Sequence, residues 1–262
     1  ILEFKDTSFV YHGARKETIH PFDFAVKEGE TIGVIGGTGS GKSTLVSLIA
    51  RLYDVTSGRI LYRGVDEKEL KPEFIRGKIG FVPQKASLFE GSLRDNMKWG
   101  KEDATDEEIY QALDIAQARE FVDQKEQGLD FRIEQNGGNL SGGQKQRLTI
   151  ARALVRKPEI LILDDSASAL DFATDARLRK AIKENTDNMT VFLVSQRVST
   201  IRNADHILVL DDGKIAGIGT HKELLRNCEV YKQIAASQLS EKELQDGMQS
   251  EDRKTEDIKS ET

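Results

Sequence analysis

Two adjacent carboxylates stand at the end of an apolar run in the stretch ILILDDSASALD, residues 160–171. The apolar run predicts a buried strand, which would deliver Asp164 and Asp165 to its polar carboxyl end. In a protein that handles phosphates, the first acid would hold Mg²⁺ and the second would face an attacking water. This chemistry requires a phosphate site elsewhere in the chain.

A glycine-rich segment, GGTGSGKST (36–44), predicts such a site. It matches the pattern G-x-x-x-x-G-K-[ST] and lies between a predicted strand and a predicted helix. Glycines let successive backbone N–H groups turn inward around phosphates, and the helix N-terminus adds partial positive charge. Lys42 would reach the β- and γ-phosphates, while Ser43 would offer its hydroxyl to Mg²⁺. The candidate contacts are Gly36, Gly37, Thr38, Gly39, Ser40, Gly41, Lys42, Ser43 and Thr44.

A second anion-binding surface is predicted in NLSGGQKQRLTIARAL (139–154). Ser141, Gly142, Gly143 and Gln144 begin a predicted helix, where a hydroxyl and free N–H groups can face outward. About a hundred residues separate this segment from the phosphate loop. Two such surfaces in one chain are explained if two chains dimerise head to tail, each covering the other's nucleotide.

Strands that alternate with helices predict a mostly parallel, three-layer α/β sheet to position these groups. Residues 1–11 and 22–28 alternate apolar and polar side chains, which predicts antiparallel strands. Other strands are predicted at 31–36, 59–62, 79–82, 160–163, 190–194 and 206–210, and helices at 42–53, 105–116, 143–155 and 171–184. The helix-rich stretch 85–157 is predicted to be an inserted subdomain.

The composition narrows the class of protein. The 262 residues are 38% hydrophobic, and their net charge of −6 argues against a nucleic-acid partner. One cysteine, Cys228, excludes an internal disulfide and fits a reducing compartment. No apolar run approaches the roughly 20 residues that span a bilayer. The start at Ile1, without methionine and inside a predicted strand, suggests a piece of a longer protein.

The phosphate loop, LSGGQ and the two-acid strand, in this order, resemble the nucleotide-binding domain of an exporter-type ABC transporter over residues 1–236. The resemblance implies a P-loop NTPase (RecA-like) core at 1–84 and 158–236, with an antiparallel β lobe and an inserted α-helical subdomain at 85–157. Residues 237–262 would follow as a charged tail. Because residues 240–262 carry eight acidic and four basic side chains and no aromatic residue, we expect this tail to be disordered.

The resemblance also implies roles for individual residues. Tyr11 would stack on the adenine ring, and Gln84 would contact Mg²⁺ and the attacking water. The metal ligands would then be Ser43, Gln84 and Asp164. Ser168, Ala169, Leu170 and Asp171 resemble the loop that crosses the dimer interface, although Asp171 could also be a plain helix cap. The segment Leu88–Asn96 would lie beneath coupling helices of a transmembrane domain, at the cytoplasmic face of the plasma membrane.

Two positions depart from the family's pattern at one place. The second acid is usually glutamate, but here it is Asp165, whose side chain is shorter by about 1.5 Å. A histidine usually contacts the γ-phosphate, and here Gln196 stands at its position. Glutamine can donate a hydrogen bond but cannot carry a proton or a positive charge. The expectation is a site that binds Mg-ATP and hydrolyses it poorly.

These departures favour an asymmetric heterodimer that exports drugs, lipids or peptides. The complete LSGGQ would serve the partner's active site, and the partner would carry the glutamate and the histidine. Two alternatives stay open at this point. The chain could be a competent homodimeric exporter ATPase, or a soluble ABC protein of repair or translation that binds nucleic acid.

Overall fold

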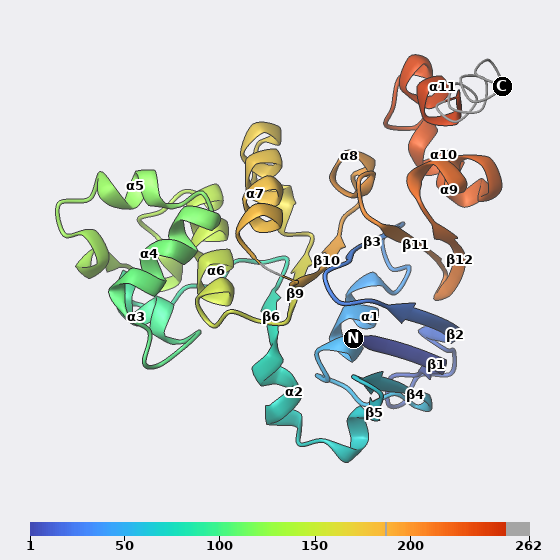
Figure 1. Ribbon diagram of the computed structural model, residues 1–262, viewed down its shortest axis with the longest axis horizontal. Coiled ribbons are helices and arrows are strands. Elements are labelled where there is room, and N and C mark those ends of the chain that lie inside the picture. Colours follow the sequence, from blue (N-terminus) through green and yellow to red (C-terminus); the bar gives the residue numbers. More distant parts are fainter. Residues whose placement is uncertain (187, 250–262) are drawn as a thin grey trace, which may run out of the picture.

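The central sheet contains six strands in the order β12-β11-β3-β10-β9-β6, and all neighbours run parallel except β11 and β12. This computed structural model describes residues 1–186 and 188–249 (Figure 1). The strands are β3 (Thr31–Gly36), β6 (Ile79–Val82), β9 (Ile160–Asp164), β10 (Thr190–Val194), β11 (His206–Asp211) and β12 (Lys214–Gly219). The predicted α/β fold with a mostly parallel sheet is confirmed.

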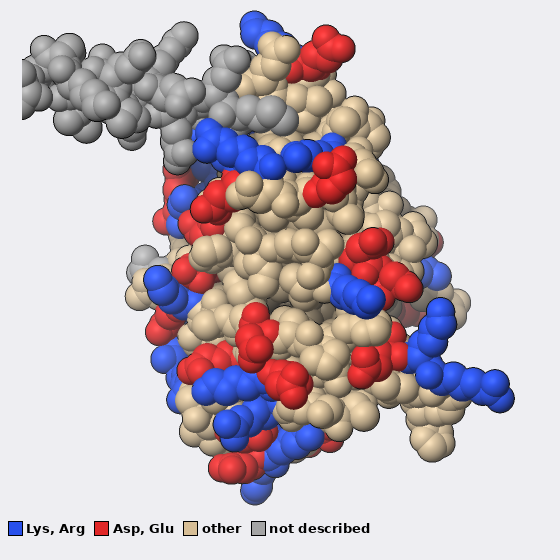
Figure 2. Space-filling model, turned by 90° about the vertical axis from the view of Figure 1, so that its right-hand side faces the viewer, with Lys and Arg blue, Asp and Glu red and all other residues tan. Residues whose placement is uncertain are grey.

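A second, antiparallel sheet forms the β lobe, with the strand order β2-β1-β4-β5. Its strands are β1 (Leu2–Phe9), β2 (Ile19–Val26), β4 (Ser57–Tyr62) and β5 (Val65–Asp66). Leu2 pairs with Val26 on one side and with Tyr62 on the other, so β1 is internal. On the face of the molecule shown in Figure 2, acidic and basic side chains are interspersed.

The two faces of the central sheet pack against different layers. In β9, Ile160 and Ile162 belong to the apolar cluster shared with the β lobe and α1 (Lys42–Ile49). Leu161 and Leu163 point to the opposite cluster, which includes α6 (Gly142–Val155) and α7 (Phe172–Asn185). Successive side chains of a strand face opposite sides, so one strand stabilises both layers. Each such buried Leu or Ile contributes about 1.5–3 kcal/mol.

The inserted region between β6 and β9 consists mainly of helices (Figure 1). Besides α6, it contains α3 (Leu93–Lys98), α4 (Asp106–Ile115), α5 (Arg119–Asp123) and a pairing of the two-residue strands β7 (Gly91–Ser92) and β8 (Arg132–Ile133). Ser92, Thr105 and Ser141 each begin a helix with a reciprocal capping box. These caps satisfy N–H groups that a helix start leaves unpaired.

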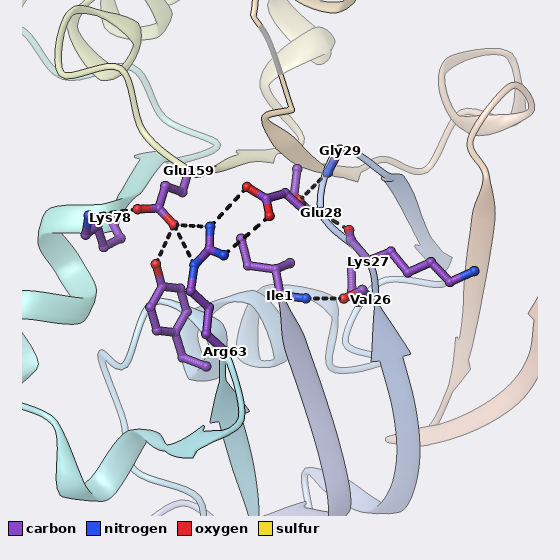
Figure 3. Close-up of polar contacts among 10 residues, drawn as sticks. Ile1, Val26, Lys27, Glu28, Gly29, Arg63, Lys78 and Glu159 are labelled. Atoms are coloured by element: carbon purple, nitrogen blue, oxygen red, sulfur yellow. Dashed lines mark hydrogen bonds and ion pairs between the residues drawn. The ribbon is translucent and has the colours of Figure 1, made fainter.

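A polar cluster joins the β lobe to the amino-terminal edge of the central sheet (Figure 3). Glu159, just before β9, accepts hydrogen bonds from Tyr62 at 2.6 Å and from Arg63, and it pairs with Lys78 at 2.7 Å. Arg63 also pairs with Glu28 at 3.0 Å. Burial alone would raise the pKa of Glu159, but the hydrogen bonds from Lys78, Tyr62 and Arg63 outweigh it and lower that pKa to about 2. Lys78 ends α2 (Pro72–Lys78).

Within the described residues, four helices follow α7, and the last of them contradicts a prediction. They are α8 (Val198–Ile201), α9 (His221–Asn227), α10 (Glu229–Ala236) and α11 (Glu241–Gln249). The expectation of a disordered tail from residue 237 is wrong for α11. Ser240 and Glu243 exchange capping hydrogen bonds at its start, and Leu244 packs against the main apolar cluster. The rest of the expected tail, residues 250–262, lies outside the described residues.

Strand β12 was not expected from the sequence. Two glycines among the residues KIAGIG weaken its strand propensity. Asp212 and Gly213 both have positive φ, 44° and 78°, and turn the chain directly from β11 into β12. An Asp-Gly pair is a known hairpin signal. Within residues 1–186 and 188–249, no helix has both the length and the apolar character needed to cross a membrane.

Candidate functional site

The phosphate loop (36–44) connects β3 to α1 at the carboxyl edge of the central sheet. A Cβ at Gly36 would lie 2.2 Å from the Leu210 carbonyl oxygen, so only glycine fits there. Gly41 precedes α1 with a φ of 102°, a conformation that favours glycine. The first turn of α1 has no side-chain cap and no acidic residue. Its N–H groups therefore remain available to an anion.

Lys42 is buried beneath this loop. Its Nζ donates to the carbonyl oxygens of Gly36 at 2.8 Å and Gly37 at 2.7 Å. Burial lowers the pKa of Lys42, while Asp165 and Asp164 act in the opposite direction. Carbonyl oxygens carry only partial charge, and hydrogen bonds to fully charged groups are roughly twice as strong. An anionic phosphate would therefore be a better partner for this ammonium than the loop itself.

Asp164 and Ser43 form the candidate metal position. The Ser43 hydroxyl donates to Asp164 Oδ1 at 3.2 Å, and Asp164 is only 7% exposed. Burial is the main cause that raises the pKa of Asp164. Among the described residues, no group of three or more His, Cys, Asp or Glu side chains could hold a metal. These few hard oxygen donors suit Mg²⁺, which is bound through one or two carboxylates and completes its shell with water and phosphate oxygens.

Asp165 faces the same space from a strained backbone position. Its φ is 47°, and its N–H donates to the carbonyl of Val194 at 2.9 Å. Gln84 Nε2 donates to Asp165 Oδ2 at 3.1 Å, which links β6 to β9 across the site. Burial raises the pKa of Asp165, opposed by Gln84, Lys42 and Arg197. Arg197 is a contributor that the sequence analysis missed, although it is the neighbour of Gln196.

Gln196 lies in the loop that follows β10. Val194 at the end of β10 is in register with Asp164, so this loop opens onto the same edge of the sheet. The Gln196 side chain is exposed, and in the described part of the chain it makes no hydrogen bond. The structure thus brings Lys42, Asp164, Asp165 and the loop of Gln196 to one edge, without a direct contact from the Gln196 side chain.

Tyr11 stands next to the phosphate loop. Its hydroxyl shares a hydrogen bond of 3.0 Å with Thr44 Oγ1. Its ring packs edge-on against Phe9 and Tyr53, with centroid distances of 4.8 Å and 5.3 Å. Tyr11 and Tyr53 remain exposed, so this aromatic group presents a surface on which a flat ring can stack.

The segment Ser141–Gln144 does not contact the phosphate loop. It begins α6, which packs against α3, α4 and the turn at Ser166–Ala169, whereas α1 packs on β3, β9 and β10 (Figure 1). Ser141 Oγ accepts from the Gln144 N–H at 3.2 Å and keeps its own proton to donate elsewhere. Gly142 is exposed, and a Cβ there would meet nothing within 4 Å. The two segments predicted to bind anions therefore lie apart in this chain (Figure 1).

The residues Ser168 to Asp171 connect the two-acid strand to α7. Ser168 Oγ donates to the Asp165 carbonyl at 2.8 Å. Asp171 Oδ1 accepts from the Thr174 N–H at 2.9 Å, and these backbone contacts lower the pKa of Asp171. The helix-cap role is therefore present in the structure. The next residue, Phe172, is 69% exposed and lies beneath the guanidinium of Arg197.

The segment Leu88–Asn96 carries an aromatic surface. Buried Asn96 holds this segment by exchanging hydrogen bonds with the backbone of Phe89, both at 2.9 Å. Phe89 stacks on Trp99 at 4.7 Å, and both rings are exposed. Arg152 of α6 lies over Phe89 and donates to the Ser87 carbonyl at 2.9 Å. This surface is connected directly to the helix that begins at Ser141.

Comparison with known proteins identifies the family. The ABC transporter family model matches residues 19–168. An uncharacterized ABC transporter ATP-binding protein of Bacillus subtilis is 46% identical over 241 residues, covering 91% of this chain and 41% of that protein. A β-(1→2)glucan export ATP-binding/permease protein of Rhodopseudomonas palustris is 43% identical, covering 91% of this chain and 39% of its own length.

Solved structures agree with this result. A bacterial Atm1-family ABC exporter with ATP bound superimposes with a TM-score of 0.86 at 36% identity, covering 92% of this chain and 42% of that one. The chain therefore spans about two-fifths of the length of these relatives. The chain belongs to the ABC transporter family, as an ATP-binding domain of that family.

Proposed function

We propose that this chain is the nucleotide-binding domain of a heterodimeric ABC exporter, and that its own phosphate site binds Mg-ATP but hydrolyses it slowly. The observation that carries the proposal is the pair of departures, Asp165 and Gln196, at one edge of an otherwise complete site. The domain would span residues 1–236, with 85–157 as the helical subdomain and 237–262 as an appended segment.

Nucleotide binding would use the groups that surround the phosphate loop. Lys42 would bind the β- and γ-phosphates, the loop N–H groups would surround them, and Tyr11 would stack on the base. Ser43, Asp164 and Gln84 would hold Mg²⁺, which when bound neutralises charge on the phosphates. The buried position of Asp164 supports this role, because a nearby cation would stabilise its ionised form.

Slow hydrolysis follows from the geometry of Asp165. Its carboxylate is about 1.5 Å shorter in reach than glutamate, and the Gln84 amide already occupies one of its oxygens. A base must come within hydrogen-bond reach of the water that it activates. Gln196 can donate to a γ-phosphate but adds no positive charge. Since general-base catalysis is worth about 10²–10⁴-fold, loss of both groups would remove most turnover.

The signature segment Ser141–Gln144 would complete the partner's site. Its complete LSGGQ sequence and its distance from the chain's own phosphate loop support a head-to-tail dimer, with Ser168–Asp171 and Phe172 at the interface. The partner would supply the glutamate and histidine of the faster site. An alternative is a homodimer of this chain, favoured by the fact that one sequence contains both halves of a site.

Coupling to transport would use the aromatic surface of Leu88–Asn96 and Trp99. The relatives that match this chain include an export permease and an ATP-bound exporter, each more than twice its length. This supports a transmembrane domain as the second partner, at the cytoplasmic face of the plasma membrane. Arg152 links that surface to α6, so movement of a docked helix could reach the signature segment.

The test is a gain of function in the full transporter. Asp165→Glu combined with Gln196→His should raise ATP turnover at this site at least about tenfold, measured in a complex whose partner site has been inactivated. Adding Lys42→Ala should abolish the gain, which assigns it to this phosphate loop. An unchanged rate contradicts the role of the two departures. Wild-type turnover equal to that of the partner site would favour the homodimer instead.

A further inference from the structure

The loop that carries Gln196 is held by a side chain from the C-terminal part of the chain. We call residues 195–198 the switch loop. Gln238 Nε2 donates to the Gln196 carbonyl at 2.7 Å, and Gln238 Oε1 accepts from the Val198 N–H at 2.9 Å. A backbone carbonyl can only accept and a backbone N–H can only donate, so one orientation of the amide satisfies both bonds.

The bond to Val198 replaces a missing helix cap. Val198 begins α8, a helix of only four residues whose N-cap, Arg197, makes no side-chain capping bond. The first N–H groups of a helix have no partner inside the helix. Gln238 supplies one from 40 residues further along the chain. The start of α8, and with it the end of the switch loop, therefore depends on the C-terminal segment.

Gln238 is presented by an anchored element. Its own N–H and that of Leu239 both donate to the Ala235 carbonyl, at 3.0 Å and 2.8 Å. Ala235 is fully buried, and Leu239 packs against the main apolar cluster. The backbone at residue 238 is thus fixed to α10, so the amide is held in place rather than swinging freely.

The other end of the switch loop is fixed to the core. The Ser195 N–H donates to the Val34 carbonyl at 3.1 Å, and Ser195 Oγ accepts from the Arg197 N–H at 3.0 Å. Gln196 therefore lies between an attachment to β3 and an attachment to Gln238. Among the described residues its carbonyl is bound and its side chain makes no hydrogen bond, so the two attachments set the backbone position from which that side chain extends.

We infer that Gln238 is a positioning residue for nucleotide recognition: it orients the switch loop so that the Gln196 amide faces the γ-phosphate. This inference rests on the proposed γ-phosphate contact of Gln196. It assigns to the C-terminal helices a part in distinguishing ATP from ADP, because only ATP carries the group that Gln196 would contact.

The test compares nucleotide affinities of the 262-residue chain in Mg²⁺, using the non-hydrolysable analogue AMP-PNP and ADP in displacement of a fluorescent nucleotide. Gln238→Leu should weaken AMP-PNP binding about fivefold, the worth of roughly one hydrogen bond, and leave ADP affinity within about twofold. Gln238→Glu should do the same, since its carboxylate would repel the Gln196 carbonyl. The matched control is Gln233→Leu, an exposed glutamine of α10 whose side chain makes no hydrogen bond among the described residues.

Hydrogen exchange gives a readout that does not depend on nucleotide. The Val198 amide should lose protection in Gln238→Leu and keep it in Gln238→Glu, which retains the acceptor. Unchanged protection in Gln238→Leu overturns the inference whatever the affinities are. Equal losses of AMP-PNP and ADP affinity overturn it too, because they indicate a general structural role.

Gln196→Ala separates this inference from the proposed function. If this variant leaves the ratio of AMP-PNP to ADP affinity unchanged, the γ-phosphate contact of Gln196 is wrong. If Gln196→Ala lowers the ratio while both Gln238 variants keep it, the contact stands and the positioning role of Gln238 is wrong.

Discussion

The two edges of the central sheet contain the same kinds of charged side chain in opposite electrostatic situations. At the carboxyl edge, burial raises the pKa of Asp164 and Asp165 and lowers that of Lys42. At the amino edge, hydrogen bonds lower the pKa of Glu159 to about 2 in spite of its burial, and they raise that of Arg63. Charge is disfavoured at the first edge and favoured at the second.

This difference separates binding from stability. Groups whose charged forms are poorly satisfied in the free protein gain most when an oppositely charged ligand arrives. Charged groups that already pair with one another gain little from a ligand, and their pairing instead holds the β lobe to the core. Substitutions at the carboxyl edge should therefore change nucleotide binding, and those at the amino edge should change the free energy of unfolding.

The largest effect is expected from Lys42→Ala. Removing an ammonium that binds phosphate should lower ATP affinity about 100-fold, since hydrogen bonds between charged groups are worth up to about 3 kcal/mol. The free energy of unfolding without nucleotide should change by less than about 1 kcal/mol. Titration calorimetry and denaturant unfolding measure the two quantities, with exposed Lys16→Ala as the control. If Lys42→Ala lowered the free energy of binding and the free energy of unfolding equally, the proposed difference between the two edges would be wrong.

Asp164→Asn should also weaken nucleotide binding, but it should leave the free energy of unfolding unchanged or raise it. In Mg²⁺, ATP affinity should fall about tenfold, because a neutral amide binds the cation less well. Above its raised pKa, ionised Asp164 opposes folding, and this penalty disappears as pH falls toward the ordinary aspartate range. The variant should therefore be as stable as wild type at pH 7, or up to about 1 kcal/mol more stable. A clear loss of stability at pH 7 would show that Asp164 is also structural.

Sequence reasoning succeeded where the signal is local. The strand and helix that flank residues 36–44 were predicted from the adjoining residues 31–36 and 42–53, and they are present as β3 and α1. Two further elements also had a local signal in the sequence, but the composition of the surrounding residues argued against them. The capping box of Ser240 and Glu243 marks α11 within a segment whose average charge predicted disorder. The Asp212–Gly213 turn marks β12 despite its glycines.

Other contacts could not be predicted because no local pattern encodes them. Gln238 lies 42 residues from the carbonyl that it binds, and an exposed glutamine at the end of a helix has no periodic signature. The pairing of Glu159 with Tyr62 spans 97 residues and depends on how the β lobe meets the sheet. Such contacts depend on how whole layers of the fold pack together. The local sequence pattern does not specify that packing.

At the amino edge, Glu159→Gln should destabilise the chain by about 2 kcal/mol, because the carboxylate that accepts from three partners, two of them cationic, becomes a neutral amide. ATP affinity should stay within about twofold, with Glu126→Gln as the exposed control. Because the folded pKa of Glu159 is lowered, its contribution is complete above pH 4.5 and disappears as pH falls toward about 2. Denaturant unfolding at pH 7 and at low pH measures this. A difference from wild type that persists at pH 2 would contradict the assignment.

The smallest effect is expected from Tyr62→Phe, which removes one of the partners of Glu159. Burial and the hydrogen bond to Glu159 raise the pKa of Tyr62 to about 12, so at pH 7 the hydroxyl is a neutral donor. Its loss should lower the free energy of unfolding by about 1 kcal/mol and leave ATP affinity unchanged. Tyr53→Phe is the matched control, since its exposed hydroxyl makes no hydrogen bond in the described residues. Because the Tyr62 hydroxyl donates to the Glu159 carboxylate, Tyr62→Phe should cost less stability in the Glu159→Gln background than in the wild-type chain. Fully additive losses would mean that the hydroxyl stabilises the β lobe through packing rather than through the amino edge.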